Sequence, residues 1–372
     1  MGLFLLIFLV IYSAIHGLVY WGLRPLLKGH AALPTLMIIW MVVMVVAPLL
    51  VRLCERQNFE ALARALAWVG YSWMGFVFIA FSLCALLVLW DIVVRLLAFV
   101  APPLSGLVAH GPISAILILL LSIAASFYGL YEANDLRVET VRLKTAKLPA
   151  GTPPIRIAQI SDMHLGLIHR DEALAPVISR LKSLNPDLVV ATGDVVDAQI
   201  NHLEGLSSLW HQLDPPLGKY AVTGNHEFYA GLNQALEYLH QSGFQVLRDQ
   251  SVDIGPFLQL AGVDDPGRGA RGDEEAGLSV ASERFTLLLK HRPDILDSSL
   301  PSFDLQLSGH THKGQLFPFT LLTGLAHSRQ AGLYRLEGDR YLYTSRGTGT
   351  WGPPMRIMAP PEITLFEIGP AD

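Results

Sequence analysis

Residues 155–164 read Ile155-Arg156-Ile157-Ala158-Gln159-Ile160-Ser161-Asp162-Met163-His164. The first six residues are rich in isoleucine and predict a short, largely buried β-strand. Asp162 and His164 follow this strand at once. Because open α/β sheets hold their sites at the carboxyl ends of strands, the stretch predicts an α/β fold and the edge of the sheet that carries the site.

The same arrangement of an apolar strand and a polar ending recurs along the chain. Each of five further expected strands is followed by a polar motif: 187–191 by Gly193-Asp194, 220–222 by Gly224-Asn225-His226-Glu227, 257–262 by Asp264-Asp265, 285–289 by Lys290-His291, and 305–307 by Gly309-His310-Thr311-His312. Helical patterns lie at 172–184 and 232–242, and further strands expected at 332–336, 340–344 and 362–368 indicate a second sheet packed on the first. We therefore expect residues 154–372 to form an α/β domain, with two sheets flanked by helices.

The first third of the chain has a different composition. Four apolar stretches, at 2–23, 33–51, 69–89 and 113–131, are each long enough to cross a bilayer as a helix. The mean hydropathy of the whole chain, +0.40, reflects this region. We predict a transmembrane region of four helices over 1–131, and a linker over 132–153 with mixed charge and a Pro- and Gly-rich end.

Basic residues in the connecting loops indicate an orientation in the membrane. The segments after the second and fourth spans carry seven of them: Arg52, Arg56, Arg64, Arg137, Arg142, Lys144 and Lys147. The loops after the first and third spans carry three: Arg24, Lys28 and Arg95. The excess predicts a multi-pass cell (inner) membrane protein whose catalytic domain lies in the cytoplasm, although Arg24 and Lys28 alone favour the opposite orientation.

The charge balance of residues 132–372 argues against one class of partner. Residues 1–131 hold six of the 27 basic and three of the 32 acidic groups, so residues 132–372 hold 21 and 29, a net charge of −8. A nucleic-acid groove needs a basic surface, so we expect no nucleic acid as a partner. The only cysteines, Cys54 and Cys84, lie in the apolar region, so residues 132–372 contain neither a disulfide nor a thiolate metal site.

The polar endings of the strands supply candidate metal ligands, all with oxygen or nitrogen donors: Asp162, His164, Asp194, Asn225, His291, His310 and His312. Such donors suit manganese, iron or zinc. His310 and His312 are one residue apart in a glycine-led turn, so their side chains can diverge toward two metals. Seven ligands with one bridging carboxylate fit a pair of divalent ions, the arrangement that holds both oxygens of an in-line phosphoryl displacement.

The order of these motifs resembles that of the calcineurin-like metallophosphoesterase superfamily, over about residues 154–369. The motifs are, in order, Asp-x-His, Gly-Asp, Gly-Asn-His-Glu, His and Gly-His-Thr-His. The whole chain is similar to transmembrane proteins with a metallophosphoesterase domain. The resemblance implies two ligand sets and a bridge: Asp162, His164 and His312 for the first metal, Asn225, His291 and His310 for the second, and Asp194 between them. It implies that His226 contacts the phosphate and protonates the leaving oxygen as general acid, with a carboxylate partner that the sequence does not identify.

Three basic residues near these motifs have two interpretations each. Many relatives with Gly-Asn-His-Glu read Gly-His-Thr-His-Gly-Gly-Gln, where this chain has Lys313. Lys313 is either a loop residue, strained if its φ is positive, or an additional cation beside the substrate phosphate. Arg346 and Arg356 either clamp a phosphate or a substrate head group, or form structural salt bridges.

The membrane anchor narrows the choice of substrate. A tethered catalytic domain meets lipid-borne phosphates at high effective concentration, so we expect a phosphodiesterase-type hydrolase that acts on phosphodiester or pyrophosphate bonds of a phospholipid or a lipid-linked substrate. The apolar run at 316–325 either lines an acyl-chain groove or the membrane surface, or forms a buried strand and core loop. The alternatives are a tethered phosphodiesterase or phosphatase for soluble substrates, a non-enzymatic membrane scaffold, and a transporter with a fused regulator.

Overall fold

The computed structural model of the chain describes residues 2–197, 203, 205–267, 272–278 and 283–371. The chain divides into two compact units. The first comprises Met1–Tyr131 with Gly352–Met355, and the second comprises Glu132–Trp351 with Arg356–Asp372.

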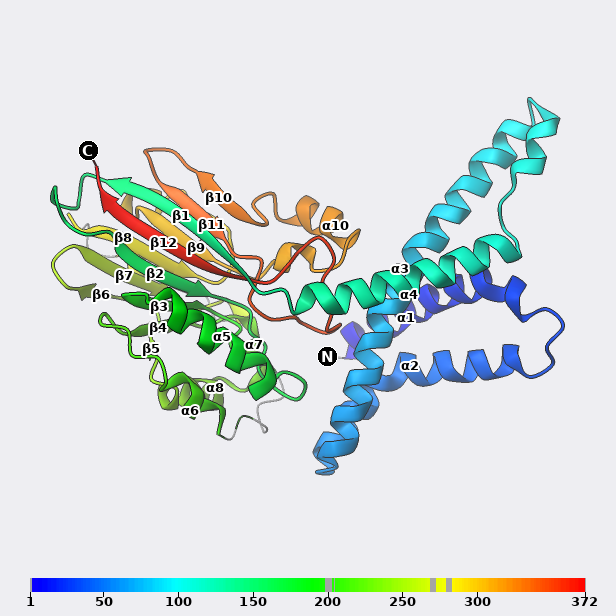
Figure 1. Cartoon of the computed structure of the whole chain (residues 1–372), viewed down its shortest axis with the longest axis horizontal. Coiled ribbons are helices and arrows are strands. Elements are labelled where there is room, and N and C mark those ends of the chain that lie inside the picture. The colour runs from blue at the N-terminus through cyan, green and yellow to red at the C-terminus, as the bar shows by residue number, and fades with distance from the viewer. Residues whose placement is uncertain (1, 198–202, 204, 268–271, 279–282, 372) are drawn as a thin grey trace. The chain divides into compact units, whose positions relative to one another are not determined.

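The first unit contains four long helices: α1 (Gly2–Leu23), α2 (Leu33–Arg56), α3 (Glu60–Ala98) and α4 (Pro112–Ala133) (Figure 1). All four are long and apolar enough to cross a membrane, as the sequence predicts. The 39 residues of α3 exceed the roughly 20 that one crossing needs. Near its end, the buried carboxylate of Asp91 accepts hydrogen bonds from the backbone N–H groups of Ala109 (2.7 Å) and His110 (3.3 Å). Short 3₁₀ helices, η1 (Arg24–Leu27) and η2 (Pro102–Leu107), follow α1 and α3.

The first sheet of the second unit has the strand order β1-β12-β2-β3-β4-β5. Its strands are β1 (Arg137–Thr145), β12 (Glu362–Pro370), β2 (Ile155–Ile160), β3 (Leu188–Thr192), β4 (Lys219–Val222) and β5 (Gln245–Val246). Strands β2 to β5 run parallel to one another, whereas β12 runs antiparallel to β2 and parallel to β1. The carboxyl ends of β2, β3 and β4 therefore lie at the same edge of this sheet.

The second sheet has the order β10-β11-β9-β8-β7-β6. Its strands are β10 (Gly332–Arg335), β11 (Tyr341–Thr344), β9 (Leu305–Ser308), β8 (Phe285–Lys290), β7 (Leu258–Val263) and β6 (Gln250–Ile254). The four central strands are parallel, and β10 and β6 are antiparallel edge strands. Two mixed sheets in an α/β domain confirm the predicted fold class.

Fully buried aliphatic side chains hold these layers together. Ile157 and Val190 of the first sheet belong to one hydrophobic cluster with Leu260 and Leu289 of the second. A second cluster joins the other face of the first sheet to α5 (Asp171–Leu184), α6 (Leu206–Trp210) and α8 (Leu232–Gln241), with Trp210 fully buried in it (Figure 1). Burial of this apolar surface is the main term that stabilises the sandwich.

The structure corrects the expected linker over 132–153, because Arg137–Thr145 forms the edge strand β1. Its charged residues alternate with apolar ones, so that Leu143 is buried while Arg142 and Lys144 face solvent. An edge strand with one solvated face has a mixed composition, which is also what a linker has. The last predicted strand, β12, lies in the first sheet between β1 and β2, and not in a sheet of its own with β10 and β11.

The apolar run at 316–325 is neither a strand nor a core loop. It ends in the helix α10 (Phe319–Ala326), in which Thr323 is buried while Phe319, Leu321, Leu322 and Leu325 are exposed. Three further short helices are α7 (Asn225–Ala230), α9 (Glu274–Gly277) and the 3₁₀ helix η6 (His312–Gly314), and a fourth, η5 (Leu300–Ser302), precedes β9.

Candidate metal centre

The seven predicted ligands lie at the carboxyl ends of parallel strands. Asp162 and His164 follow β2, and Asp194 follows β3. Asn225 begins α7, directly after β4. The second sheet contributes the three remaining histidines after β8 and β9: His291, His310 and His312. The sequence pattern of strand and polar ending thus corresponds to two sets of loops, one from each sheet.

The backbone of these loops is unusual. Five of the seven predicted ligands have φ between 47° and 72°: Asp162, His164, Asp194, His310 and His312. The left-handed region costs an L-residue roughly 1–2 kcal/mol, so it persists only where the surroundings fix it. Here hydrogen bonds between the loops do so: the N–H of Asp162 donates to the carbonyl of Gly193 (3.0 Å), and that of His164 to the carbonyl of Asp194 (3.0 Å).

Two motif glycines permit the close approach of these loops. A Cβ at Gly309 would overlap the Ser161 hydroxyl and the Asp162 carboxylate. A Cβ at Gly224 would overlap the Asp194 carboxylate. The glycines of Gly-His-Thr-His and Gly-Asn-His are therefore required by the space between the loops, since any side chain would displace a ligand.

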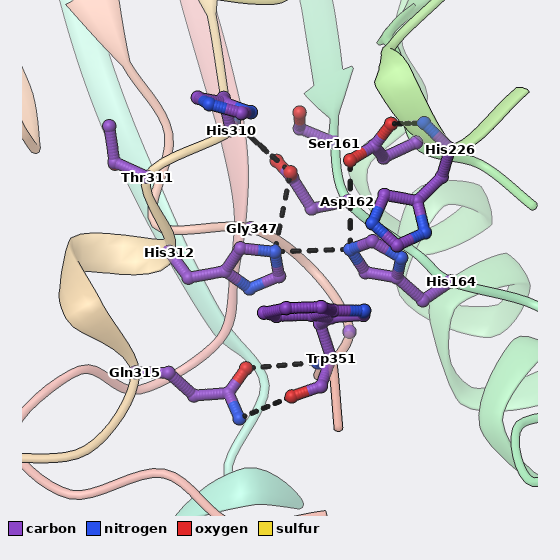
Figure 2. Close-up of polar contacts among 12 residues, drawn as sticks. Ser161, Asp162, His164, His226, His310, Thr311, His312, Gln315, Gly347 and Trp351 are labelled. Atoms are coloured by element: carbon purple, nitrogen blue, oxygen red, sulfur yellow. Dashed lines mark hydrogen bonds and ion pairs between the residues drawn. The ribbon is translucent and has the colours of Figure 1, made fainter. Parts of the chain in front are cut away.

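One group of candidate ligands is formed by Asp162, His164 and His312, which point toward one another (Figure 2). The Nε2 atoms of the two histidines are 3.1 Å apart, and Nε2 of His312 is 3.4 Å from Oδ1 of Asp162. Burial alone would raise the pKa of Asp162, but attraction to His312 outweighs it and keeps the pKa of this carboxyl below its usual range. Asp162 is therefore ionised.

A second group contains Asp194, His291 and His310. Nε2 of His291 is 3.1 Å from Nδ1 of His310 and 3.2 Å from Oδ2 of Asp194. The same Oδ2 is 3.9 Å from Nε2 of His164 in the first group. The Asp194 carboxylate thus lies between the two groups, where a bridging ligand has to be.

Several features of the site fit bound metal ions. Burial lowers the pKa of both His164 and His310 to about 3, so these imidazoles are neutral, the form that ligates metals. The amide Oδ1 of Asn225 is buried and has no hydrogen-bond partner among the described residues. A buried acceptor without a partner is costly, and a cation would satisfy it. The oxygen and nitrogen donors suit manganese, iron or zinc.

His226 lies beside the ligands and has the carboxylate partner that the sequence left unidentified. Its Nδ1 is 2.8 Å from Oδ1 of Asp197, and its backbone N–H donates to Oδ1 of Asp194 (2.8 Å). Burial lowers the pKa of His226, but attraction to Asp194 and the hydrogen bond with Asp197 outweigh burial and raise it to about 9. The charge of Asp194 and the contact with Asp197 thus favour the protonated imidazole, the form that a general acid needs.

Sequence reasoning did not assign a role to Glu227, which is fully buried. Its carboxylate accepts hydrogen bonds from the backbone N–H groups of Gly224 (2.7 Å), Asp194 (2.9 Å), Val195 (2.8 Å) and Val196 (3.2 Å). It thereby fixes the loop that carries Asp194 against the start of α7. A glutamate three residues after the N-cap Gly224 has the spacing of a capping box, which predicts its contact with the N–H of Gly224 but not its three contacts with the loop of Asp194.

Two aromatic side chains flank His226. The ring centroids of Tyr229 and Trp351 are 5.3 and 5.6 Å from that of His226, and both side chains are about half exposed. The backbone of Trp351 is held on both sides by the Gln315 amide, with distances of 2.9 and 3.0 Å (Figure 2). These rings form apolar walls beside His226.

The two arginines considered as phosphate clamps are engaged in the fold. Arg346 forms ion pairs with Glu139 and Glu362, both at 2.6 Å. Arg356 is fully buried and donates to the carbonyl of Arg346 (2.8 Å), while its Nη2 lies 3.3 Å from Nδ1 of His312. The geometry favours structural roles for both, with Arg356 supporting a ligand loop.

The carboxylates after β7 are also paired. Asp264 binds Arg248 (2.6 Å) and accepts from the hydroxyl of Thr223 (2.8 Å), and Asp265 binds Arg292 (2.7 Å). Both aspartates are buried. Their ion pairs and the Thr223 contact connect β7 to the segments that follow β4, β5 and β8.

Lys313 has φ 51° and ψ 30°, which is the left-handed region. We expect Lys313→Gly to raise the free energy of unfolding by about 1 kcal/mol, because glycine adopts this conformation without steric cost. Chemical denaturation of the purified chain measures it. If the ammonium also contacts the substrate phosphate, KM for a phosphodiester rises in the same variant, whereas an unchanged KM assigns Lys313 to the loop alone.

The family model described as calcineurin-like phosphoesterase matches residues 155–314. An uncharacterized metallophosphoesterase from Aquifex aeolicus is 43% identical over 65% of this chain and 95% of its own length. A transmembrane protein with metallophosphoesterase domain from Danio rerio is 35% identical over 67% of this chain and 61% of its own. Among solved structures, a dimetal phosphatase from Danio rerio aligns with 53% of this chain and 88% of its own, at 16% identity and a TM-score of 0.33.

Proposed function

The chain belongs to the calcineurin-like metallophosphoesterase family, and on this premise we propose that it is a membrane-anchored phosphodiesterase or pyrophosphatase acting on a phospholipid or a lipid-linked substrate. The family uses a dimetal centre. The observation that carries the proposal is the position of Asp194 between two groups of candidate ligands, with His226 beside it, in a chain with four helices long and apolar enough to cross a membrane.

The residues have separate tasks in this proposal. Asp162, His164 and His312 would hold one divalent ion, and Asn225, His291 and His310 the other, with Asp194 shared. Bound ions would supply an activated water and neutralise the phosphate charge. His226 gives its proton to the leaving oxygen, and Asp197 orients its ring and sustains the proton through the 2.8 Å contact with Nδ1. Glu227 keeps the loops of Asp194 and Asn225 at a fixed separation.

Anchoring supports a lipid-borne phosphate as the substrate. A domain tethered to a bilayer meets lipid substrates at an effective concentration that a soluble compound does not reach. The net charge of −8 over residues 132–372 disfavours a nucleic-acid substrate. The excess of basic residues after the second and fourth spans supports a cytoplasmic position of the catalytic domain.

A direct test compares two substrates with manganese added. The full-length chain is incubated with bis(p-nitrophenyl) phosphate and with a detergent-solubilised lipid extract. We expect metal-dependent turnover of both, and the products released from the extract identify the lipid. Turnover of the soluble diester alone would favour the tethered enzyme for soluble substrates. Binding of two metals without any turnover would favour the scaffold.

Phe317 and Phe319 lie beside the ligand loop and are partly exposed. If they contact acyl chains, Phe317→Ala and Phe319→Ala lower the kcat/KM for the lipid substrate and leave that for bis(p-nitrophenyl) phosphate unchanged. The expected loss is roughly 10- to 100-fold for each ring, from the apolar area removed. Equal losses on both substrates would show that the phenylalanines only stabilise the site.

A further inference from the structure

An exposed apolar patch adjoins the metal centre in sequence and in space. It consists of Phe317 (43% exposed), Phe319 (46%), Leu321 (62%), Leu322 (57%), Leu325 (85%) and Met358 (59%). Met358 belongs to it because the segments Gln315–Phe317 and Ile357 are hydrogen-bonded: the N–H of Phe317 donates to the carbonyl of Ile357, and that of Ile357 to the carbonyl of Gln315. The patch begins five residues after His312, a predicted ligand. Large exposed apolar patches mark interaction sites.

The charge around this patch differs from that of the rest of the domain. Residues 309–336 contain Lys313, Arg329 and Arg335 but no Asp or Glu, although residues 132–372 as a whole have a net charge of −8. Arg335 is ion-paired with Asp339 in the β10–β11 hairpin. Lys313 and Arg329 remain on either side of the patch in the sequence. Apolar side chains flanked by cations and free of anions suit an anionic lipid surface.

The strand register places the start of the domain at the same edge as the ligands. Arg137, the first residue of β1, is opposite Glu362, and β12 then pairs Thr364 with Gln159 near the end of β2. The start of β1 is therefore at the end of the sheet from which Asp162 follows. Three residues connect Ala133, the last residue of α4, to Arg137, and such a connection spans at most about 14 Å.

A contact inside the second unit joins this entry point to the patch. The carboxylate of Glu132 accepts a hydrogen bond from the backbone N–H of Ala359 at 3.5 Å, and Ala359 follows Met358 directly. The residue at which the chain leaves its fourth span is thus beside a member of the patch. The point at which the chain enters the second unit and this member of the patch therefore lie at the same edge of the domain.

We propose that the apolar patch inserts into the headgroup and upper acyl region of the bilayer that α4 crosses, and so presents the metal centre to the lipid surface. The occupant of the patch is the bilayer interface, with Lys313 and Arg329 at the level of anionic headgroups. The proposal rests on the membrane anchoring in the proposed function, but not on the reaction, so its test does not depend on turnover.

The test measures the depth of α10 in vesicles of phosphatidylcholine and phosphatidylglycerol. The full-length chain with Cys54→Ser and Cys84→Ala receives one cysteine, Leu321→Cys or Leu325→Cys, for labelling with the fluorophore NBD. Glu337→Cys is the matched control, because Glu337 is exposed in the hairpin before β11, at the opposite end of the second sheet from the ligands. Half of the vesicles contain lipids with a nitroxide near the headgroup end of the acyl chain.

For NBD at positions 321 and 325, we expect emission at shorter wavelength than in water and loss of fluorescence in nitroxide vesicles. For NBD at position 337, we expect the same emission as in water and no quenching. Emission as in water at all three positions would overturn the proposal. So would a blue shift without quenching, which means that protein, either a second copy or another part of this chain, covers the patch. Quenching in a chain that hydrolyses nothing would support the docking surface and refute only the proposed reaction.

A paired variant connects the patch to activity. Leu321→Asp combined with Leu325→Asp removes the apolar character of α10 without touching a ligand. We expect lower turnover of lipid in vesicles and unchanged turnover of bis(p-nitrophenyl) phosphate. Quenching of the NBD labels in the parent chain, together with unchanged lipid turnover in the double variant, would support insertion of the patch. The same result would overturn the role of the patch in presenting the metal centre to lipid.

Discussion

Asp194→Asn is expected to abolish metal-dependent turnover and to release both metals. The carboxylate lies 3.2 Å from Nε2 of His291 and 3.9 Å from Nε2 of His164, so one substitution removes charge from both ligand groups. Loss of a residue that only orients a ligand costs about 10- to 100-fold in metal affinity, so the loss of a shared ligand is expected to be at least that large. Metal content after dialysis and titration calorimetry with Mn²⁺ measure it.

The matched control is Asp339→Asn, the same chemical change at an exposed residue of the β10–β11 hairpin. It should retain two metals and full turnover. Because asparagine keeps the shape of Asp194, the variant should also retain the parent circular dichroism spectrum. Two metals bound at parental affinity in folded Asp194→Asn would contradict the bridging role.

His226→Ala is expected to lower kcat by about 10²- to 10⁴-fold while both metals stay bound. The reason is that none of the assigned metal ligands is changed, whereas the proton donor for the leaving oxygen is lost. His240→Ala, at an exposed residue of α8, is the matched control and should retain full activity. Steady-state kinetics together with metal content separate this result from that of Asp194→Asn. A substrate with a very acidic leaving group should be affected least, because its oxygen needs no proton.

The pH dependence tests the partner of His226. The folded environment raises the pKa of this imidazole to about 9, against burial, through the charge of Asp194 and the hydrogen bond with Asp197. A general acid works only while protonated, so kcat/KM should decline as the pH rises through the pKa that His226 has in the metal-bound enzyme. Asp197→Asn removes an anion, lowers the pKa of His226 and should move the decline to lower pH. An unchanged profile would exclude Asp197 as the partner that sustains the proton.

Four candidate membrane spans, the fold class and the candidate ligands could all be predicted from the sequence alone. Long apolar runs cross a bilayer because unsatisfied backbone groups cannot remain in lipid, so length and composition suffice to recognise four helices. Short apolar strands such as Ile155–Ile160 are recognisable because both faces of a central parallel strand are buried. Ligands at the ends of such strands follow from the same pattern, since parallel strands end at one edge.

The roles of residues that act through the backbone or from a partly exposed position depend on the tertiary structure and could not be predicted from the sequence. Glu227 binds four backbone N–H groups, three of them in the loop after β3, and no sequence spacing predicts contacts between loops of different strands. Asp197 is one of many carboxylates until folding brings it to 2.8 Å from His226. The edge strand β1 was mistaken for a linker because pairing with β12, 225 residues later, defines it. Local sequence specifies periodicity and burial, whereas these contacts depend on the register in which distant strands pair.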